Sequence, residues 1–219
     1  MKIPTCAVAM GLMAVALSAA PASAQSRSSA YQAYVIVDFN TMAPKRTLMD
    51  AAETALDRYT TQLDTVRPIG IRTPEEPGRF ELTNPLSDPR LGSLGPLAAL
   101  AGARSQSFVT ATCEGAVWTA SLQRQISGSQ NLKATLCLFP YKNDTAEGYH
   151  LNVYMSDVHD QGGNISQRLG RAMVGRLIGT PEDFTKRMII DTVTAIETAA
   201  DTRAVLVESD PDDFGLTTR

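Results

Sequence analysis

The chain is poor in the residues that metal binding and acid–base catalysis use most often. Its 219 residues contain only two histidines, three cysteines and one tryptophan. Acidic residues outnumber basic ones, 23 to 20, which gives a net charge of −3. A structural zinc centre needs four ligands, mostly Cys and His, and binding to nucleic acid or anionic lipid needs a basic surplus. The composition therefore predicts no metal or other cofactor, and no nucleic-acid partner.

Sequence motifs of common hydrolases and nucleotide-binding proteins are also missing. The chain has no G-x-S-x-G nucleophile elbow, no S-x-x-K, no G-x-x-x-x-G-K loop and no G-x-G-x-x-G fingerprint. A serine paired with His150 or His159 needs no motif, so an enzyme stays an alternative. The sequence favours a protein that is not an enzyme.

Long hydrophobic runs are absent after the first 24 residues. Lys2 supplies a positive start, residues 6–20 are apolar, and Ala22, Ser23 and Ala24 form an A-x-A cleavage site, which is typical of a Sec signal peptide. No later run approaches the ~18 apolar residues of a transmembrane helix. We therefore expect a periplasmic or secreted protein without a membrane span, cleaved after Ala24. An N-terminal membrane anchor is the alternative interpretation.

Two cysteines, Cys113 and Cys137, remain after this cleavage, and exported proteins tend to pair their cysteines. A hairpin that turns at residues 127–128 would place Cys137 opposite Trp118. Cys113 would then lie about 17 Å farther along the strand, which is too far for a disulfide. A disulfide therefore requires a bulge or chain reversal near residues 114–115, or another register. The alternative is two buried thiols.

Hydrophobic periodicity predicts a strand over residues 31–39 and a helix over 44–66. Residues 67–107 form a proline- and glycine-rich excursion that interrupts regular structure, either a surface segment with a function or a poorly ordered flap. Within it we expect a short strand around residues 79–82 and a short helix near residues 96–103. Three strands with alternating apolar residues, two helices and a possible last strand follow. The strands are expected at 115–124, 131–139 and 148–155, the helices at 165–178 and from 181 onward, and the last strand at 203–207.

This order predicts an α+β fold, because the strands are grouped and the helices flank them. We expect an antiparallel sheet of about four to five strands with helices packed on one face. A single domain would span residues 31–208. A disordered linker at 25–30 would precede it, and an acidic flexible tail at 209–219 would follow.

One polar stretch, "SDVHDQGGN" at residues 156–164, combines residue types that bind metals or transfer protons. Asp157, His159 and Asp160, together with Asp38 near the end of the first strand, are the candidate catalytic residues. The alternative is a polar loop between a strand and a helix, with the glycine pair forming the turn.

The second candidate site is the predicted meander of strands, where aromatic and polar residues concentrate. Tyr and Trp are common anchors of protein interfaces, and a sheet covered on one face would expose the other. The candidate binding residues are Trp118, Thr135, His150, Asn152 and Tyr154. They predict an accessory protein of the cell envelope, an assembly factor or an inhibitor, that binds an envelope protein or a glycan. A carrier with a small-ligand pocket between helices and sheet is a further alternative.

Overall fold

The structure, a computed structural model, describes residues 28–60, 62–83, 109–127, 130–160, 181–212, 214 and 216. The predicted signal peptide, most of the excursion and the predicted helix at 165–178 lie outside these residues. Two helices and eight strands are described. They are β1 (Ser28–Asn40), α1 (Lys45–Leu56), β2 (Leu63–Val66), β3 (Glu81–Thr83), β4 (Thr110–Thr112), β5 (Trp118–Ser127), β6 (Gln130–Lys142), β7 (Glu147–Asp160), α4 (Pro181–Ala200) and β8 (Ala204–Asp210).

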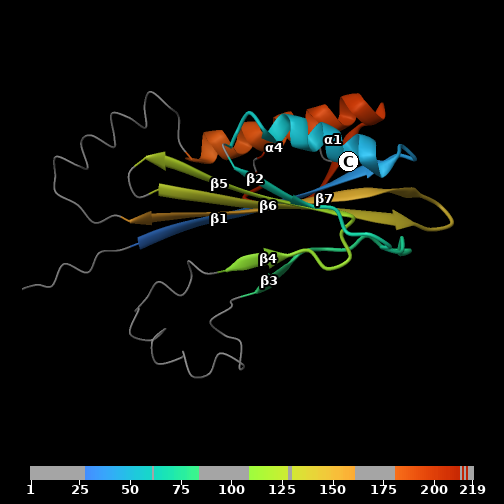
Figure 1. Ribbon diagram of the computed structural model, residues 1–219, viewed down its shortest axis with the longest axis horizontal. Coiled ribbons are helices and arrows are strands. Elements are labelled where there is room, and N and C mark those ends of the chain that lie inside the picture. Colours follow the sequence, from blue (N-terminus) through green and yellow to red (C-terminus); the bar gives the residue numbers. More distant parts are fainter. Residues whose placement is uncertain are drawn as a thin grey trace, which may run out of the picture.

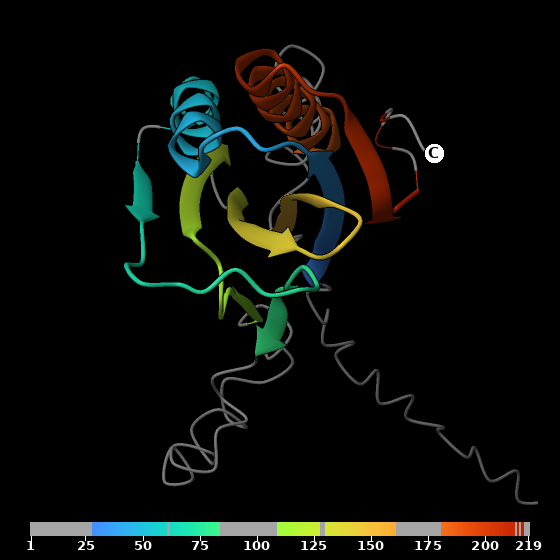
Figure 2. The same ribbon diagram turned by 90° about the vertical axis from the view of Figure 1, so that its right-hand side faces the viewer.

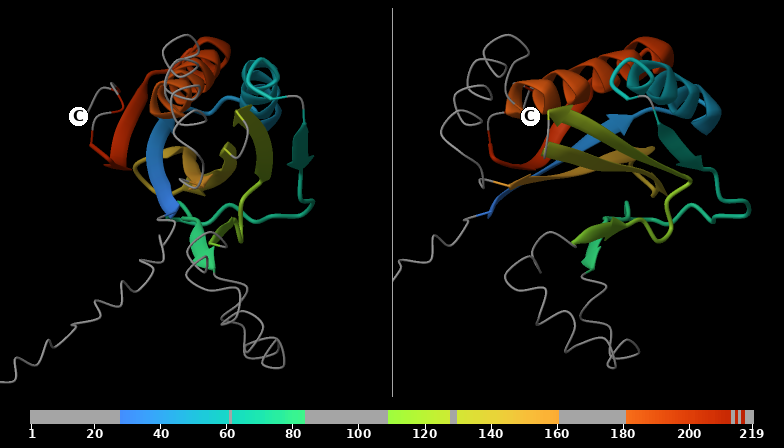
Figure 3. Two further views of the ribbon diagram at one scale, coloured as in Figure 1. Left: turned by 90° about the vertical axis from the view of Figure 1, so that its left-hand side faces the viewer. Right: turned by 60° about the vertical axis from the view of Figure 1, so that its left-hand side comes forward.

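Six of the strands form one antiparallel sheet in the order β2-β5-β6-β7-β1-β8. The helices α1 and α4 lie side by side across one face, and the two-stranded ribbon β3–β4 lies on the opposite side (Figures 1 and 3). The predicted α+β fold, with an antiparallel sheet and helices on one face, is thus confirmed. The sheet has six strands rather than four to five. Strand β3 of the additional ribbon overlaps the short strand expected around residues 79–82, whereas β4 was not expected.

The main core fills the space between the helices and the sheet. Strand residues that alternate along the sequence face the helices, as the period of two requires, and each helix buries one apolar stripe against them. Its largest fully buried side chains are Phe39, Leu48, Leu56, Trp118, Leu136, Leu138, Leu151, Met155 and Met188. The sheet curls around this core (Figure 2). A smaller core of Ala116, Cys137 and Phe139 lies on the other face.

The predicted helix over residues 44–66 is too long. Helix α1 ends at Leu56, and Leu63–Val66 form the edge strand β2, which pairs with β5. Between them, the Thr60 hydroxyl donates to the carbonyl oxygen of Gln62 and accepts from its backbone N–H. Such local side-chain bonds compete with the helix. The spacing of apolar residues alone does not reveal this turn.

The predicted acidic tail is also wrong in part. Strand β8 includes Ser209 and Asp210, and the Phe214 side chain is buried in the main core, with Leu216 packed against it. One apolar side chain every few residues is enough to hold such a segment on the domain, although acids surround it in the sequence.

A disulfide joins Cys113 and Cys137, with their Cα atoms 5.7 Å apart. The chain reverses at Gly115, whose φ is +84°, and the Ala116 N–H donates to the Cys113 carbonyl. This is the reversal that a disulfide required. The hairpin register differs by one residue from the expected one, since Cys137 faces Thr119 and Trp118 faces Leu138.

Candidate functional site

The face of the six-stranded sheet opposite the helices, here called the second face, is covered over its central part, whereas Gln32, Ser121 and Lys133 on the same face are exposed. After β2 the chain crosses below the sheet on this side and leads into β3 (Figure 2). Residues 74–80, here called the strap, lie over the central strands. The predicted excursion is therefore, in its described first part, a cover for the surface that the sequence suggested as a binding platform.

The register of the strands builds the second face in three rungs. Tyr34, Tyr154 and Thr135 are paired across β1, β7 and β6, followed by Ile36, Asn152 and Cys137, and then by Asp38, His150 and Phe139. Because alternate residues of a strand share a face, these side chains lie together on the second face.

Hydrogen bonds, ring packing and an ion pair hold the strap on this face. The Lys142 N–H donates to the Pro74 carbonyl at 2.8 Å, and Asn152 Nδ2 donates weakly to the Gly78 carbonyl at 3.4 Å. The Phe80 ring packs between those of Tyr34 and Tyr154, with both centroid distances 5.8 Å. Arg79 forms an ion pair with Glu208 of β8.

Gly78 fits because the strap approaches the sheet closely. A Cβ atom at this position would lie 2.5 Å from the Phe139 ring, well inside van der Waals contact. A residue with a side chain would push the strap away from the sheet. The glycine therefore fixes how deeply the strap can lie.

Two polar atoms beneath the strap are buried without a hydrogen-bond partner among the described residues: Asn152 Oδ1 and the Tyr154 hydroxyl. Both residues are almost completely buried, at 0% and 4% exposure. The third such atom, Thr185 Oγ1, lies on α4. Burial raises the pKa of the Tyr154 hydroxyl. An unpaired buried hydroxyl or amide oxygen costs about 1–3 kcal/mol of stability, so the strap covers this surface at a cost.

A polar cluster consists of Asp38 and His150, which belong to the third rung, and Tyr141, which lies two residues after Phe139 on β6. The Tyr141 hydroxyl donates to Asp38 Oδ1 at 2.8 Å, and His150 Nε2 lies 3.6 Å from the same oxygen. Gly148, opposite Tyr141, leaves the room that the Tyr141 hydroxyl occupies. Burial lowers the pKa of His150 and nearby Arg79 lowers it further, against the opposing effect of Asp38. His150 is therefore neutral at pH 7 and could accept a proton.

On the other side of the strap, the Glu208 carboxylate binds Arg79 and so attaches the strap to β8. The Tyr34 hydroxyl donates to Glu208 Oε1 at 2.6 Å, and Glu208 also binds Arg79. The hydrogen bonds from Tyr34 and Arg79 lower the pKa of Glu208, and the bond to Glu208 raises the pKa of Tyr34. Glu208 is therefore an ionised carboxylate, and in the free protein it binds the Arg79 cation.

The predicted binding surface needs correction at three of its residues. Trp118 faces the helices and is fully buried, and its Nε1 donates to Glu53 of α1 at 2.7 Å. Its phase with Ala120 and Leu122 was the signal for this orientation. Asn152 and Tyr154 do lie on the second face, but under the strap rather than in solvent. Thr135 and His150 also lie on this face and are partly exposed.

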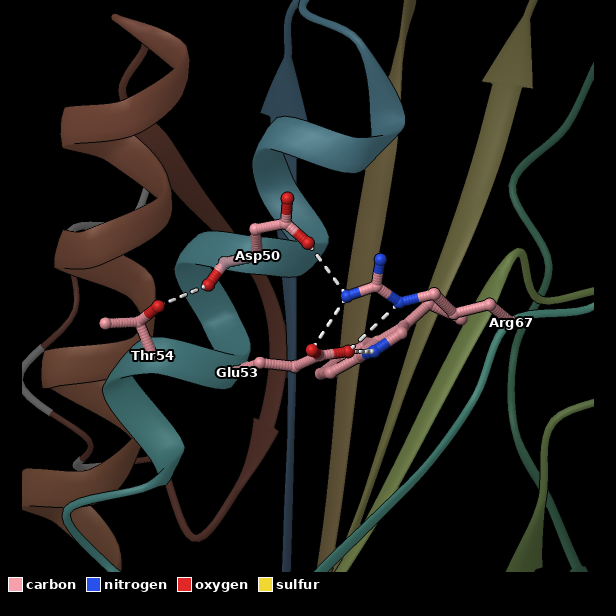
Figure 4. A network of polar contacts seen from close by, with 5 residues as sticks. Asp50, Glu53, Thr54 and Arg67 are labelled. Carbon is pink, nitrogen blue, oxygen red and sulfur yellow. Dashed lines mark hydrogen bonds and ion pairs between the residues drawn. The ribbon is translucent and has the colours of Figure 1, made fainter.

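Glu53 belongs to a network at the outer surface of α1 (Figure 4). Arg67, just after β2, binds Asp50 and Glu53 at 2.8 and 2.7 Å. The arginine thus ties the edge of the sheet to the helix, while Glu53 also anchors the indole of Trp118. The network is structural, since its two acids already hold the cation.

The strand register does not bring the four candidate catalytic residues together, because Asp38 lies far along the sheet from the other three. Asp157, His159 and Asp160 belong to β7 and pair with Tyr31, Ser29 and Ser28 of β1, so residues 157–160 are strand rather than the expected loop. Residues 161–164, the rest of that stretch, lie outside the described residues. Asp38 pairs with His150 instead. His150 and His159 are nine residues apart on one strand, about 30 Å at the usual rise.

A hollow of about 720 Å³ lies between the two helices at the surface, rather than between helices and sheet. Small residues line it, and the hydroxyls of Thr54 and Thr198 donate to carbonyls of their own helices. The full lining is Thr47, Asp50, Ala51, Thr54, Ala55, Arg58, Asp191, Thr194, Ala195, Thr198 and Ala199. A smaller pocket of about 190 Å³ lies between α4 and strands β1 and β8, where a small-ligand carrier was expected to have one. Its volume is below the ~300 Å³ at which typical ligand sites begin.

Comparison with known proteins gives no family: no family model matches the chain, and no match was found among curated protein sequences. Within the part of the chain that the structure describes, no helix is long and apolar enough to cross a membrane. The same residues contain no group of three or more His, Cys, Asp or Glu side chains that could hold a metal ion. The site must therefore be interpreted from its own geometry.

Sequence reasoning missed Tyr34, Arg79, Phe80 and Glu208 as parts of the second face. Tyr34 lies in β1 and Glu208 in β8, and the pairing of these two strands was not predicted. Arg79 and Phe80 lie in the excursion, where a short strand was expected but no contact partner could be assigned.

Proposed function

We propose that the chain is an exported, non-enzymatic binding protein of the cell envelope, and that it binds a protein partner with the second face of its sheet. It would act as an accessory or assembly factor, or as an inhibitor of that partner. The signal-peptide pattern of the first 24 residues supports export.

One observation carries the proposal: the buried, unpaired Asn152 Oδ1 and Tyr154 hydroxyl under the strap. Buried polar groups in folded proteins nearly always have partners. Stability would increase if these two groups were apolar, since no described residue of the free protein forms a hydrogen bond with either of them. Residues that reduce stability in this way are typical of binding sites, where function needs the group that folding does not.

The experiment is to replace Tyr154 by Phe and measure stability and partner capture together. We expect the free energy of unfolding to stay the same or to rise by up to roughly 2 kcal/mol, because a buried hydroxyl without a partner is removed. Capture of the protein that the wild type retains from its host envelope should fall at least tenfold. Urea unfolding and quantitative affinity purification give the two results.

Tyr149→Phe is the matched control on the same strand. The Tyr149 hydroxyl has a partner, the Ala43 carbonyl at 3.2 Å, and Tyr149 packs against the main core. This substitution should cost about 1 kcal/mol and leave capture unchanged. If Tyr154→Phe captures the partner as well as wild type does, the second face is not the binding surface and the proposal fails.

A further inference from the structure

We propose that the partner segment bound by the second face is an extended peptide with a glycine–basic–aromatic triplet, and that the strap, with Gly78, Arg79 and Phe80, is its intramolecular stand-in. The inference rests on the proposed function and adds the chemistry of the partner. The strap shows directly which side chains this face accepts, because it occupies the face in the free protein.

The glycine position follows from the close approach to Phe139. With a Cβ 2.5 Å from that ring excluded, an incoming peptide can lie at the depth of the strap only if it has glycine there. At this depth its carbonyl meets Asn152 Nδ2, as that of Gly78 does. The amide of Asn152 therefore recognises backbone, which suits an extended peptide of otherwise variable sequence.

The aromatic position follows from the two tyrosines on either side of Phe80. The Phe80 ring meets Tyr34 edge-on, at an interplanar angle of 68°, and meets Tyr154 tilted at 43°. Beneath it lies the small core of Ala116, Cys137 and Phe139. An aromatic ring fills this place by packing and by ring–ring attraction, and a shorter side chain would leave it empty.

The basic position follows from Glu208. This carboxylate is kept ionised by the bonds from Tyr34 and Arg79, and it lies at the edge of the strap. When the strap lifts, Arg79 leaves and the carboxylate faces an unoccupied place. A peptide with Arg or Lys after its glycine restores the ion pair, whereas an acidic residue would be repelled.

The strap itself fills the site incompletely, which allows displacement. It leaves Asn152 Oδ1 and the Tyr154 hydroxyl unpaired, and its hydrogen bond to Asn152 is long. Most of its other residues, including Glu75, Glu76 and Arg79, are exposed. A partner peptide that also donates to Asn152 Oδ1 gains an interaction that the strap does not make.

The test measures whether a separate peptide with the sequence of the strap binds to the second face. The probe is a fluorescently labelled peptide of residues 74–80 (PEEPGRF), and the target is the full chain with Arg79→Ala and Phe80→Ala, which lacks the anchors of its own strap. Fluorescence anisotropy should show saturable binding to this variant. Binding to the wild-type protein should be at least tenfold weaker, because the covalent strap competes at an effective concentration in the millimolar range.

Altered peptides define the triplet. Peptides with Phe replaced by Ala, with Arg replaced by Glu, or with Gly replaced by Ala should each bind the double variant at least tenfold more weakly. If the double variant does not fold, Gly78→Ala replaces it, since its Cβ displaces the strap by contact with Phe139. Faster hydrogen exchange of the Lys142 amide, which donates to the Pro74 carbonyl, establishes that the strap has lifted.

The outcomes separate this inference from the proposed function. No peptide binding to a folded variant with a lifted strap, or equal binding of the three altered peptides, overturns the inference. Partner capture that still depends on the Tyr154 hydroxyl would in that case leave the proposed function standing with a different partner chemistry. Peptide binding combined with capture that ignores Tyr154→Phe would overturn the proposed function instead.

Discussion

Single polar atoms decide how the aromatic residues of this protein are used. Trp118 and Tyr154 are both buried on the sheet, but the indole N–H of Trp118 has Glu53 as its partner, whereas the Tyr154 hydroxyl has none among the described residues. The first arrangement is typical of a structural core residue, since buried Trp usually finds an acceptor. The second arrangement lowers the stability of the fold, because the buried Tyr154 hydroxyl forms no hydrogen bond there. We therefore infer that this hydroxyl serves a function.

At the residue scale, Glu53→Ala should destabilise the protein by about 1–3 kcal/mol, because it leaves the buried Trp118 Nε1 without its acceptor. Asp50→Ala is the matched control, since Asp50 lies on the same helix and binds the same Arg67 but is exposed. An exposed ion pair contributes about 0–1 kcal/mol. Urea unfolding measures both. Equal losses would show that Trp118 does not depend on Glu53.

His150 makes stability depend on pH. Its pKa is lowered in the folded protein from the ordinary 6.5, so the unfolded chain binds the proton more tightly. The contribution of His150 is therefore fully present above pH ~6.5 and is lost as the pH falls from there through the lower folded pKa. We expect the free energy of unfolding to rise with pH in this window. His150→Gln should flatten that part of the profile.

The other histidine of the chain provides the comparison for this profile. His159→Gln leaves the cluster of Asp38, Tyr141 and His150 intact, so it should keep the rise of stability with pH. A profile that flattens only in His159→Gln would assign the effect to the other end of β7 and contradict the burial of His150 as its cause.

At the element scale, the excursion after β2 acts as a second layer over the sheet. Two connections secure it: the strap contacts at residues 74–80, and the disulfide from Cys113, which follows β4, to Cys137 of β6. Among the described residues, the small core between them contains three buried apolar residues. Such a small core buries little apolar surface, so the covalent link should matter more here than in the main core.

Replacing Cys113 and Cys137 together by Ala should destabilise the covering layer. A bridge that closes a loop of 24 residues is worth roughly 3 kcal/mol by chain entropy. We expect hydrogen exchange to speed up at β3–β4 and at the Lys142 amide, which donates to the strap, while amides of α1 and α4 stay protected. Uniform loss of protection over the whole chain would contradict the independence of the two cores. Reduction of the wild-type protein by a dithiol is the control without substitution.

At the scale of the whole molecule, two faces of one sheet have different roles. The face under α1 and α4 is filled by a large apolar core, which supplies most of the stability. The second face has a thin cover, unpaired polar atoms and charged residues around it. This asymmetry places the stability of the domain and its proposed binding function on opposite sides, so that one can be changed with little effect on the other.

Local patterns in the sequence were sufficient for most of the elements and for little of the site. The alternation of Leu132, Ala134, Leu136 and Leu138 predicted β6 because a strand with one buried face repeats every two residues. The helix over 44–66 was extended too far, since side-chain bonds at Thr60 end the pattern before apolar spacing does. Candidate residues His150 and Asn152 were placed on the correct face, but their burial depends on a segment about 70 residues away in the sequence.

The sequence by itself determined the antiparallel α+β fold, because periodicity and turn residues act over a few neighbours along the chain. Only the tertiary structure decided what covers the second face. Gly78, Phe80 and Glu208 contact or flank Asn152 and Tyr154 only after strands far apart in sequence have been paired. Whether these residues come into contact depends on how the whole chain folds and not on any local sequence pattern. The unpaired polar atoms that suggest a function are therefore visible only in the tertiary structure.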